Sequence, residues 1–182
     1  MKRVVLVVAA AAAFAFAAAA AKPRVARESM MVLEKKFDKR IEGYSIDDPF
    51  YLLGTARGVY LENYGVIFTA EMNLVGAGVV TPFRPAFSKE QIEKLRLKKI
   101  DRVIALKKIM RDMMVDSATA LGSVPLEQNV AVGVTLFYYS WEDRTGLPAQ
   151  VLMTAKRQTL VAVEAGKLDA ADLDKAIQVE EL

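Results

Sequence analysis

The chain has 182 residues, and its composition excludes several classes of protein. It contains no cysteine and no histidine, which excludes disulfide bonds, thiolate nucleophiles, cysteine-ligated zinc or iron–sulfur sites and the usual general base. Apolar residues make up 53% and charged residues 26%, a balance that is typical of a globular protein and not of a disordered one. We expect no metal site and no cofactor.

The N-terminal segment has the pattern of a Sec-type signal peptide. A short basic start, Met1-Lys2-Arg3, precedes an uncharged run rich in alanine and valine from Val4 to Ala21. Small residues at 19–21 fit a cleavage site, so we predict a signal peptide over 1–21 and a periplasmic or secreted protein, in a bacterial style of export. The alternative is an uncleaved anchor, because about 18 apolar residues can just span a bilayer.

Cleavage would lower the net charge of the protein. It would remove two of the 25 basic residues and none of the 22 acidic ones, which lowers the net charge from +3 to +1. Residues 22–182 are enough for one domain with its own hydrophobic core.

The first predicted element of that domain is a helix over about 24–42. Its apolar residues recur at steps of three and four: Met30, Leu33, Phe37 and Ile41. Gly43 is expected to end the helix in a left-handed conformation. After it, Asp47-Asp48-Pro49 predicts a turn, or a helix start with Asp48 as the cap and Pro49 as the first residue inside.

A β-hairpin is predicted over about 58–75. From Val66 onward, apolar residues alternate with more polar ones over ten positions, which is the period of a half-buried strand. Asn63-Tyr64-Gly65 supplies the turn, with either the glycine or the asparagine in the left-handed position. The alternative is one bent strand with a bulge at Gly65.

A loop and a long helix follow. Glycines and prolines between 76 and 87 mark the loop, which we expect Phe83 and Phe87 to pin to the domain; an exposed aromatic lip is the alternative.

Ser88 and Gln91 form a capping box that opens a helix over about 89–121. Unbroken, this helix is roughly 50 Å long, whereas a domain of this size is only about 40 Å across. The helix should therefore bend, break or overhang, and an overhang would suit a protein partner or a homo-oligomer.

The C-terminal third is predicted to contain one strand and helices. A central strand is expected over about 130–141, and because both of its faces are largely apolar, it should be covered on two sides. The sequence does not indicate which strand of the hairpin it pairs with. A helix from Pro148 to Ala165 closed by Gly166 should follow, then a short helix capped by Asp169 that runs to about Glu180. The fold class is therefore α+β, with a small antiparallel sheet packed by the long helix and C-terminal helices.

A basic segment on the long helix offers one candidate binding surface. We single out Lys94, Lys98, Arg102 and Lys108 as binding candidates, and Trp141 separately, because its ring would suit a sugar. The four cations would suit an anionic envelope surface. Nucleic acid is not expected, because no aromatic residues are interleaved for stacking. The competing interpretation is the solvated face of an amphipathic helix.

Acidic residues offer weak candidates for catalysis. Asp112 and Asp116 lie one helical turn apart, but without an acidic loop they predict a solvated pair and not a calcium site. Glu71 and Glu142 accompany strand-like segments rich in aromatic residues, and two such carboxylates could hydrolyse a glycosidic bond. No serine or phosphate-binding motif of a familiar enzyme is present. The sequence therefore predicts a non-enzymatic exported protein that binds or assembles with a cell-envelope component, with a carboxylate-dependent hydrolase as the alternative.

Overall fold

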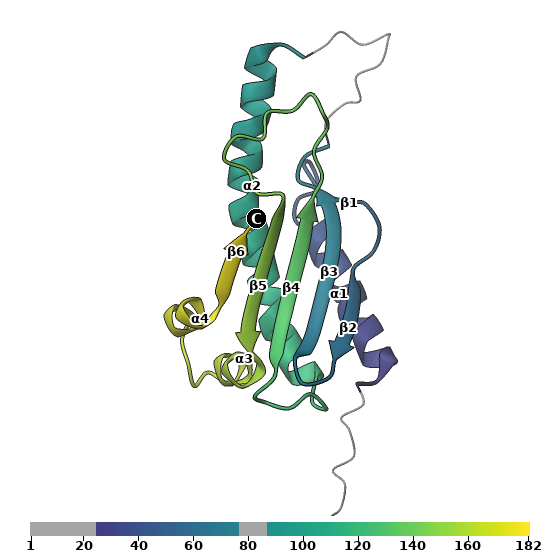
Figure 1. Ribbon diagram of the computed structural model, residues 1–182, viewed down its shortest axis with the longest axis vertical. Helices are drawn as coiled ribbons and strands as arrows, with labels where there is room; N and C mark the ends of the chain where they lie inside the picture. Colours follow the sequence, from purple (N-terminus) through teal and green to yellow (C-terminus); the bar gives the residue numbers. More distant parts are fainter. Residues whose placement is uncertain (1–24, 77–86) are drawn as a thin grey trace, which may run out of the picture.

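A computed structural model of the chain describes residues 25–76 and 87–182 (Figure 1). The predicted signal peptide and Phe83 lie outside these ranges. The described chain forms one sheet with helices, so the α+β prediction is confirmed. Within the same ranges, no helix is both long and apolar enough to cross a membrane.

The sheet has six strands and is antiparallel except for one central pair. Its order is β1-β3-β4-β5-β6, with β2 also paired to β3. The strands are β1 (Tyr51–Leu52), β2 (Arg57–Leu61), β3 (Gly65–Asn73), β4 (Asn129–Leu136), β5 (Gln150–Lys156) and β6 (Gln178–Glu181). β3 and β4 run parallel, because the chain returns along a helix between them.

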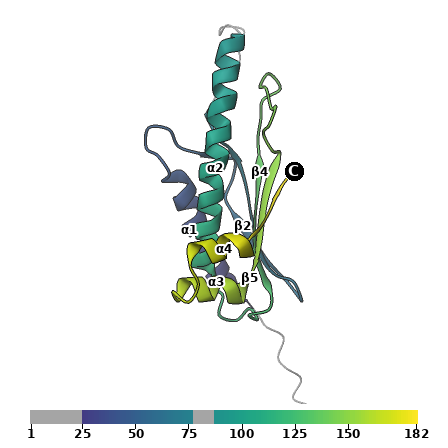
Figure 2. The same ribbon diagram turned by 90° about the vertical axis from the view of Figure 1, so that its left-hand side faces the viewer.

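The helices of the described ranges all lie on one face of the sheet (Figure 2). They are α1 (Arg27–Glu42), α2 (Lys89–Ala120), α3 (Arg157–Glu164) and α4 (Ala170–Ala176). Between this layer and the sheet lies the core, where Phe37, Phe68 and Met110 are fully buried. The inward-facing apolar residues of β3 fall on alternate positions, as the period of a strand requires.

The predicted hairpin is confirmed as β2 and β3. Arg57 to Leu61 pairs antiparallel with Thr69 to Gly65, which excludes the single bent strand. Asn63 takes the left-handed conformation in the turn, at a φ of 65°. Gly65 is needed for a second reason, since a Cβ on it would lie 1.9 Å from the carbonyl oxygen of Asn129.

The central strand is confirmed, but its expected cover on two sides is wrong. β4 ends at Leu136, and the chain continues to Trp141 without strand structure. The figures show helices over one face of β4 only. Ala131 and Gly133 on the other face are small enough to be buried between neighbouring side chains, whereas Thr135 on that face is exposed. We call this uncovered side the open face of the sheet.

The helix predicted from Pro148 to Ala165 is wrong over its first half. Residues 150–156 form β5, because Val151, Met153 and Ala155 all face the core when the segment pairs with β4. Only 157–164 is helical, and Gly166 follows it at a φ of 69°. The last helix is capped by Asp169 as predicted, but it ends at Ala176 and β6 replaces the rest.

One predicted detail near α1 is wrong: Gly43 has a φ of −81°, so the helix does not end in a left-handed residue. Of the two alternatives for 47–49, the helix start is excluded, because no helix starts at Pro49, and the chain bends at 46–48 instead. The Asp48 carboxylate lies 2.5 Å from Arg102 and 2.7 Å from Lys98, which ties the loop to α2.

The long helix is unbroken and overhangs the sheet. α2 runs for 32 residues from the confirmed capping box, in which the Gln91 backbone N–H donates to Ser88 at 3.2 Å. Figures 1 and 2 show its N-terminal part extending past the ends of the strands. At the other end, the buried Arg157 guanidinium donates 2.8 Å hydrogen bonds to the carbonyls of Ala118 and Val124. It thereby satisfies a carbonyl that the helix end leaves unpaired.

Candidate interaction surface

The overhang of α2 and the loop after β4 extend beyond the sheet side by side. We call residues 89–104 and 137–149 together the projecting end. Figures 1 and 2 both show the loop alongside this part of α2, and side-chain contacts join the two. The projecting end is therefore built from two segments that are separated in the sequence by residues 105–136.

A buried ion pair holds the two segments together. The Lys99 ammonium lies 2.5 Å from the Glu142 carboxylate, and the two side chains are 0% and 2% exposed. Burial lowers the pKa of Lys99, although the charge of Glu142 favours the protonated form. A second oxygen of Glu142 accepts a 3.4 Å hydrogen bond from the backbone N–H of Tyr139. Glu142 is therefore a structural link between the loop and the helix.

Tyr138 adds to the same contact. Its ring lies under the Lys99 ammonium, 4.7 Å from the ring centre, and its hydroxyl donates a 2.8 Å hydrogen bond to the carbonyl of Pro148. Burial and the nearby charge of Glu142 raise the pKa of Tyr138 to about 12. The hydroxyl therefore stays protonated at neutral pH.

Arg96 attaches the tip of the loop to the helix. Its guanidinium donates to the Thr145 carbonyl at 3.0 Å and makes two hydrogen bonds to Glu93, at 2.7 and 2.8 Å. Asp143 lies 3.8 Å from the same guanidinium. The pKa of Asp143 is lowered chiefly by the backbone and side-chain hydrogen bonds from Thr145. These contacts hold the loop in one position without burying its surface.

A row of aromatic rings runs along the loop. Phe137 and Tyr139 meet edge to face at 5.1 Å, and Tyr139 and Trp141 are stacked at 5.8 Å between ring centres. Phe87, just before α2, stacks on Trp141 at 4.3 Å. All four rings are half-buried, so they stiffen the loop and still contribute to its surface. Phe87 thus contacts the domain as predicted.

The exposed large apolar residues of α2 lie only in its N-terminal half. Leu97 is 49% exposed and Ile104 is 64% exposed, and the spacing of seven puts both on one side of the helix. In the C-terminal half, the large apolar residues are buried: Leu106, Ile109, Met110, Met113 and Met114. The helix is therefore covered by its own domain at one end and uncovered at the other.

Comparison of the chain with protein-family models, with curated proteins and with solved structures found no match.

Of the residues that build the projecting end, Lys99 and Arg96 are not among the candidates that the sequence indicated. Lys99 had a signal, because it lies between Leu95 and Val103 on the apolar side of the helix. A charge in that position predicts a buried partner.

The basic candidates are mostly paired with acids of this chain. Lys94 lies 2.9 Å from Glu90, Lys98 is paired with Asp48, and Arg102 is 6% exposed. Lys108 is exposed and has no ion pair within the described ranges. An anionic envelope surface therefore stays a prediction, which salt-sensitive binding to anionic liposomes would test.

The candidate carboxylates are directed to different sides. Glu71 is exposed on the open face of β3, whereas Glu142 is buried against α2. The structure therefore does not bring this pair together, and the hydrolase alternative stays a prediction. Asp116 is bound by Arg40 and lies 3.0 Å from Lys36, so it joins α2 to α1 where a solvated pair had been predicted. No group of acids suited to a metal ion occurs in the described part of the chain.

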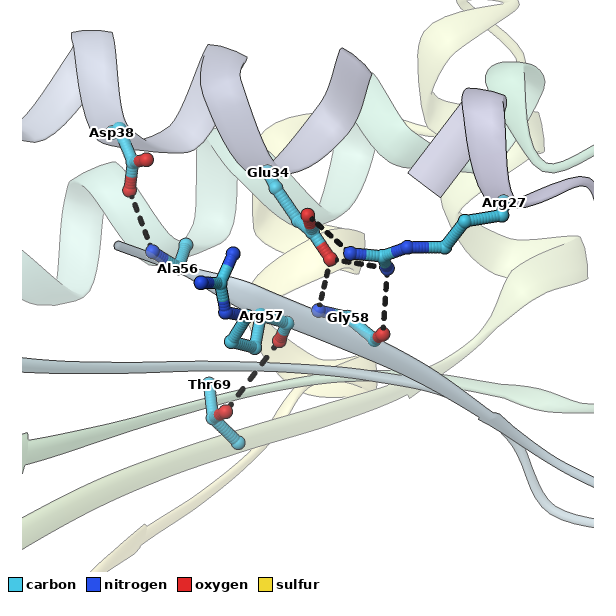
Figure 3. Close-up of polar contacts among 7 residues, drawn as sticks. All are labelled: Arg27, Glu34, Asp38, Ala56, Arg57, Gly58 and Thr69. Carbon is cyan, nitrogen blue, oxygen red and sulfur yellow. Dashed lines mark hydrogen bonds and ion pairs between the residues drawn. The ribbon is translucent and has the colours of Figure 1, made fainter. Parts of the chain in front are cut away.

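One edge of the sheet is closed by side chains of α1. Glu34 accepts a 2.7 Å hydrogen bond from the backbone N–H of Gly58 in β2, and Arg27 donates to the Gly58 carbonyl at 3.3 Å. Asp38 accepts from the backbone N–H of Ala56 at 2.8 Å. Figure 3 shows these three side chains reaching from the helix to the strand. The N–H of Ala56 and both outward backbone groups of Gly58 are therefore satisfied within the chain.

Proposed function

We propose that this chain is an exported, non-enzymatic protein that binds or assembles with a component of the cell envelope, and that the projecting end is its contact surface. The observation that carries the proposal is the change along α2 from covered to uncovered. Leu97 and Ile104 stay exposed on a helix whose other half is buried in its own domain.

The proposal also draws on how the projecting end is stiffened. The buried Lys99–Glu142 pair, the Arg96 contacts and the aromatic row hold the loop against α2 before any partner arrives. A surface that is already ordered loses less conformational entropy on binding. Stiffening of a segment outside the core suits a binding surface better than it suits a connection between strands.

Export rests on the sequence of residues 1–21, and it is tested separately. In cells of the source organism, the protein should be found in the envelope or secreted fraction with the mass of residues 22–182. A full-length mass would support the anchor instead. Protein retained in the cytoplasm would contradict export.

The contact surface is tested by site-specific cross-linking in the same cells. A photo-reactive amino acid at Leu97 or Ile104 should capture a partner or a second copy. The matched control is Val32 on α1, which is 65% exposed but lies away from the projecting end. Equal capture from both helices, or capture from Val32 alone, would contradict the assignment of the projecting end.

Substitution gives an independent measure. Leu97→Lys together with Ile104→Lys should lower co-purification of the captured partner by at least about tenfold, because a charge would replace apolar contact area. Val32→Lys should leave it unchanged. All three positions are exposed, so the variants should unfold at nearly the same denaturant concentration as the parent protein.

A further inference from the structure

The two edges of the sheet differ in how their backbone groups are satisfied. At the β2 edge, Glu34, Arg27 and Asp38 bond the N–H and C=O of Gly58 and the N–H of Ala56. At the other edge, β6 pairs with β5 only, and no further strand joins it within the described ranges. All four residues of β6 are exposed. Figure 1 shows β6 as the outermost strand on its side.

The register shows which backbone groups of β6 point outward. Gln150 and Leu182 exchange both backbone hydrogen bonds, at 3.0 and 3.1 Å. Bonded and non-bonded pairs alternate along an antiparallel ladder, so Glu180 and Gln178 also face β5. The N–H and C=O groups of Val179 and Glu181 therefore point away from the sheet. They present two donors and two acceptors at the spacing that another strand requires.

The C-terminal segment that contains β6 is rich in acidic residues, and part of this charge is paired within the chain, as where Asp174 lies 2.8 Å from Arg111. From Glu164 to Leu182 the chain has six acidic and two basic residues: Glu164, Asp169, Asp172, Asp174, Glu180 and Glu181 against Lys167 and Lys175. Glu181 is paired with Lys107 of α2 at 2.5 Å, whereas Glu180 belongs to the open face. A segment that adds to β6 would place its side chains beside Glu180.

This charge disfavours a second copy as the occupant. Antiparallel pairing of two β6 strands centred on Glu180 would put the two Glu180 side chains directly opposite each other. Like charges in that position are destabilising. A segment with lysine or arginine at alternate positions would gain from the same geometry.

We infer that β6 is a strand-addition site for an extended, basic segment of a partner protein. Backbone bonds to Val179 and Glu181 would provide the affinity, and Glu180 would select for positive charge. A hollow of about 360 Å³ lies on the open face beside β6 and has Leu152, Thr154, Gln178 and Glu180 among its lining residues. This inference does not depend on the role of the projecting end.

The test uses the full mature chain and a fluorescent peptide of alternating lysine and valine as the probe. Binding is followed by fluorescence anisotropy, and backbone contact by hydrogen exchange at Val179 and Glu181. The matched probe carries N-methyl groups on alternate backbone amides, which keeps the charge and removes the ladder bonds. We expect the methylated peptide to bind at least about tenfold more weakly, a loss of one or more hydrogen bonds. Equal binding of the two peptides would overturn the inference.

Two variants of the protein locate the site. Val179→Pro removes an outward N–H without breaking a bond to β5, and proline is tolerated in that setting on edge strands. Glu180→Gln removes the charge, with Glu90→Gln at the far end of α2 as the charge-matched control. Both β6 variants should weaken binding of the unmethylated peptide roughly tenfold, and the control should not. Unchanged binding in both would overturn the assignment to β6.

The oligomeric state of the protein without peptide provides a third test. Analytical ultracentrifugation should show no self-association that depends on β6. A parent protein that dimerises, with a Val179→Pro variant that is monomeric, would overturn the inference. It would mean that a second copy occupies the edge despite the opposed acids.

Discussion

At the scale of single residues, the buried Lys99–Glu142 pair shows how a charge can stabilise one conformation of a loop. Removing two charges from water is costly, and their attraction offsets that cost only with good geometry and further hydrogen bonds. Glu142 has both, since it also accepts from Tyr139. Loss of one partner leaves the other buried without compensation.

We therefore predict that Glu142→Gln lowers the free energy of unfolding by roughly 3–5 kcal/mol, the cost of breaking a buried pair from one side. Urea denaturation at neutral pH measures it. The double variant Lys99→Met with Glu142→Leu is the control, and it should recover most of the loss because no unpaired charge remains. A loss below about 1 kcal/mol in Glu142→Gln would contradict the structural role and would favour the catalytic alternative for this residue.

Glu34 predicts a dependence of stability on pH. Burial alone would raise the pKa of Glu34, but the hydrogen bonds from Arg27 and from the Gly58 N–H outweigh it, so the pKa is below the ordinary 4.5. The ionised form is thus favoured in the folded state. Its contribution is complete above pH 4.5 and is lost as the pH falls through the lowered pKa.

Glu34→Gln should accordingly flatten the fall in unfolding free energy on acidification below that pH. Urea unfolding at a series of acidic pH values measures the slope. Glu28→Gln removes the same charge from an exposed position of α1, and it should leave the slope nearly unchanged. Equal slopes in the two variants would show that the carboxylate is not ionised preferentially in the folded state.

At the scale of elements, the sequence predicted the helices and strands that have a local pattern, and it missed the strands that form only through pairing with a neighbour. α2 was found because a capping box and an apolar face agree with each other over its whole length. β5 was taken for helix because Leu152, Met153 and Ala155 are good helix formers, and only pairing with β4 shows its alternation. β6 gave no strand signal, since a four-residue edge strand with the sequence Gln-Val-Glu-Glu has no buried face.

The parallel pairing of the two central strands could have been predicted from the sequence. A strand, a long helix and a second strand require the two strands to run parallel if they are neighbours, because the helix returns the chain to its starting end. That reasoning would have predicted the parallel pairing of β3 with β4. The pairing of Lys99 with Glu142 was not within reach, since the two residues are 43 positions apart and nothing local links them.

β3 and β4 approach each other closely at Gly65, so we predict that replacing this glycine costs much more stability than replacing Gly146. Gly65→Ala would put a Cβ 1.9 Å from the Asn129 carbonyl at a φ of 129°, so backbone would have to move. We expect a loss of roughly 3–5 kcal/mol in unfolding free energy from strain and overpacking together. Gly146→Ala, at a φ of 74° with open space around it, should cost only about 1 kcal/mol. Similar losses in urea denaturation would contradict the close approach of the two strands.

At the scale of the whole molecule, α2 belongs to two environments. From Val103 to Ala118 its inner face is part of the core, and Ser117 even turns its hydroxyl back to the Met113 carbonyl at 2.6 Å. Its N-terminal part extends past the sheet (Figure 1), supported by the loop and by Arg96. One continuous helix thus connects the stable centre to the projecting end.

This division predicts a gradient of amide hydrogen exchange along α2. Amides of the first three turns should exchange at least ~100-fold faster than those between Val103 and Ala118, because local opening near the overhang disrupts few buried contacts. In Glu142→Gln the gap should widen, since the loop would no longer be fixed to the helix. Uniform protection in the isolated monomer would contradict the uncovered state of the projecting end. Protection that rises in the first turns only when a partner is added would place that partner on the overhang.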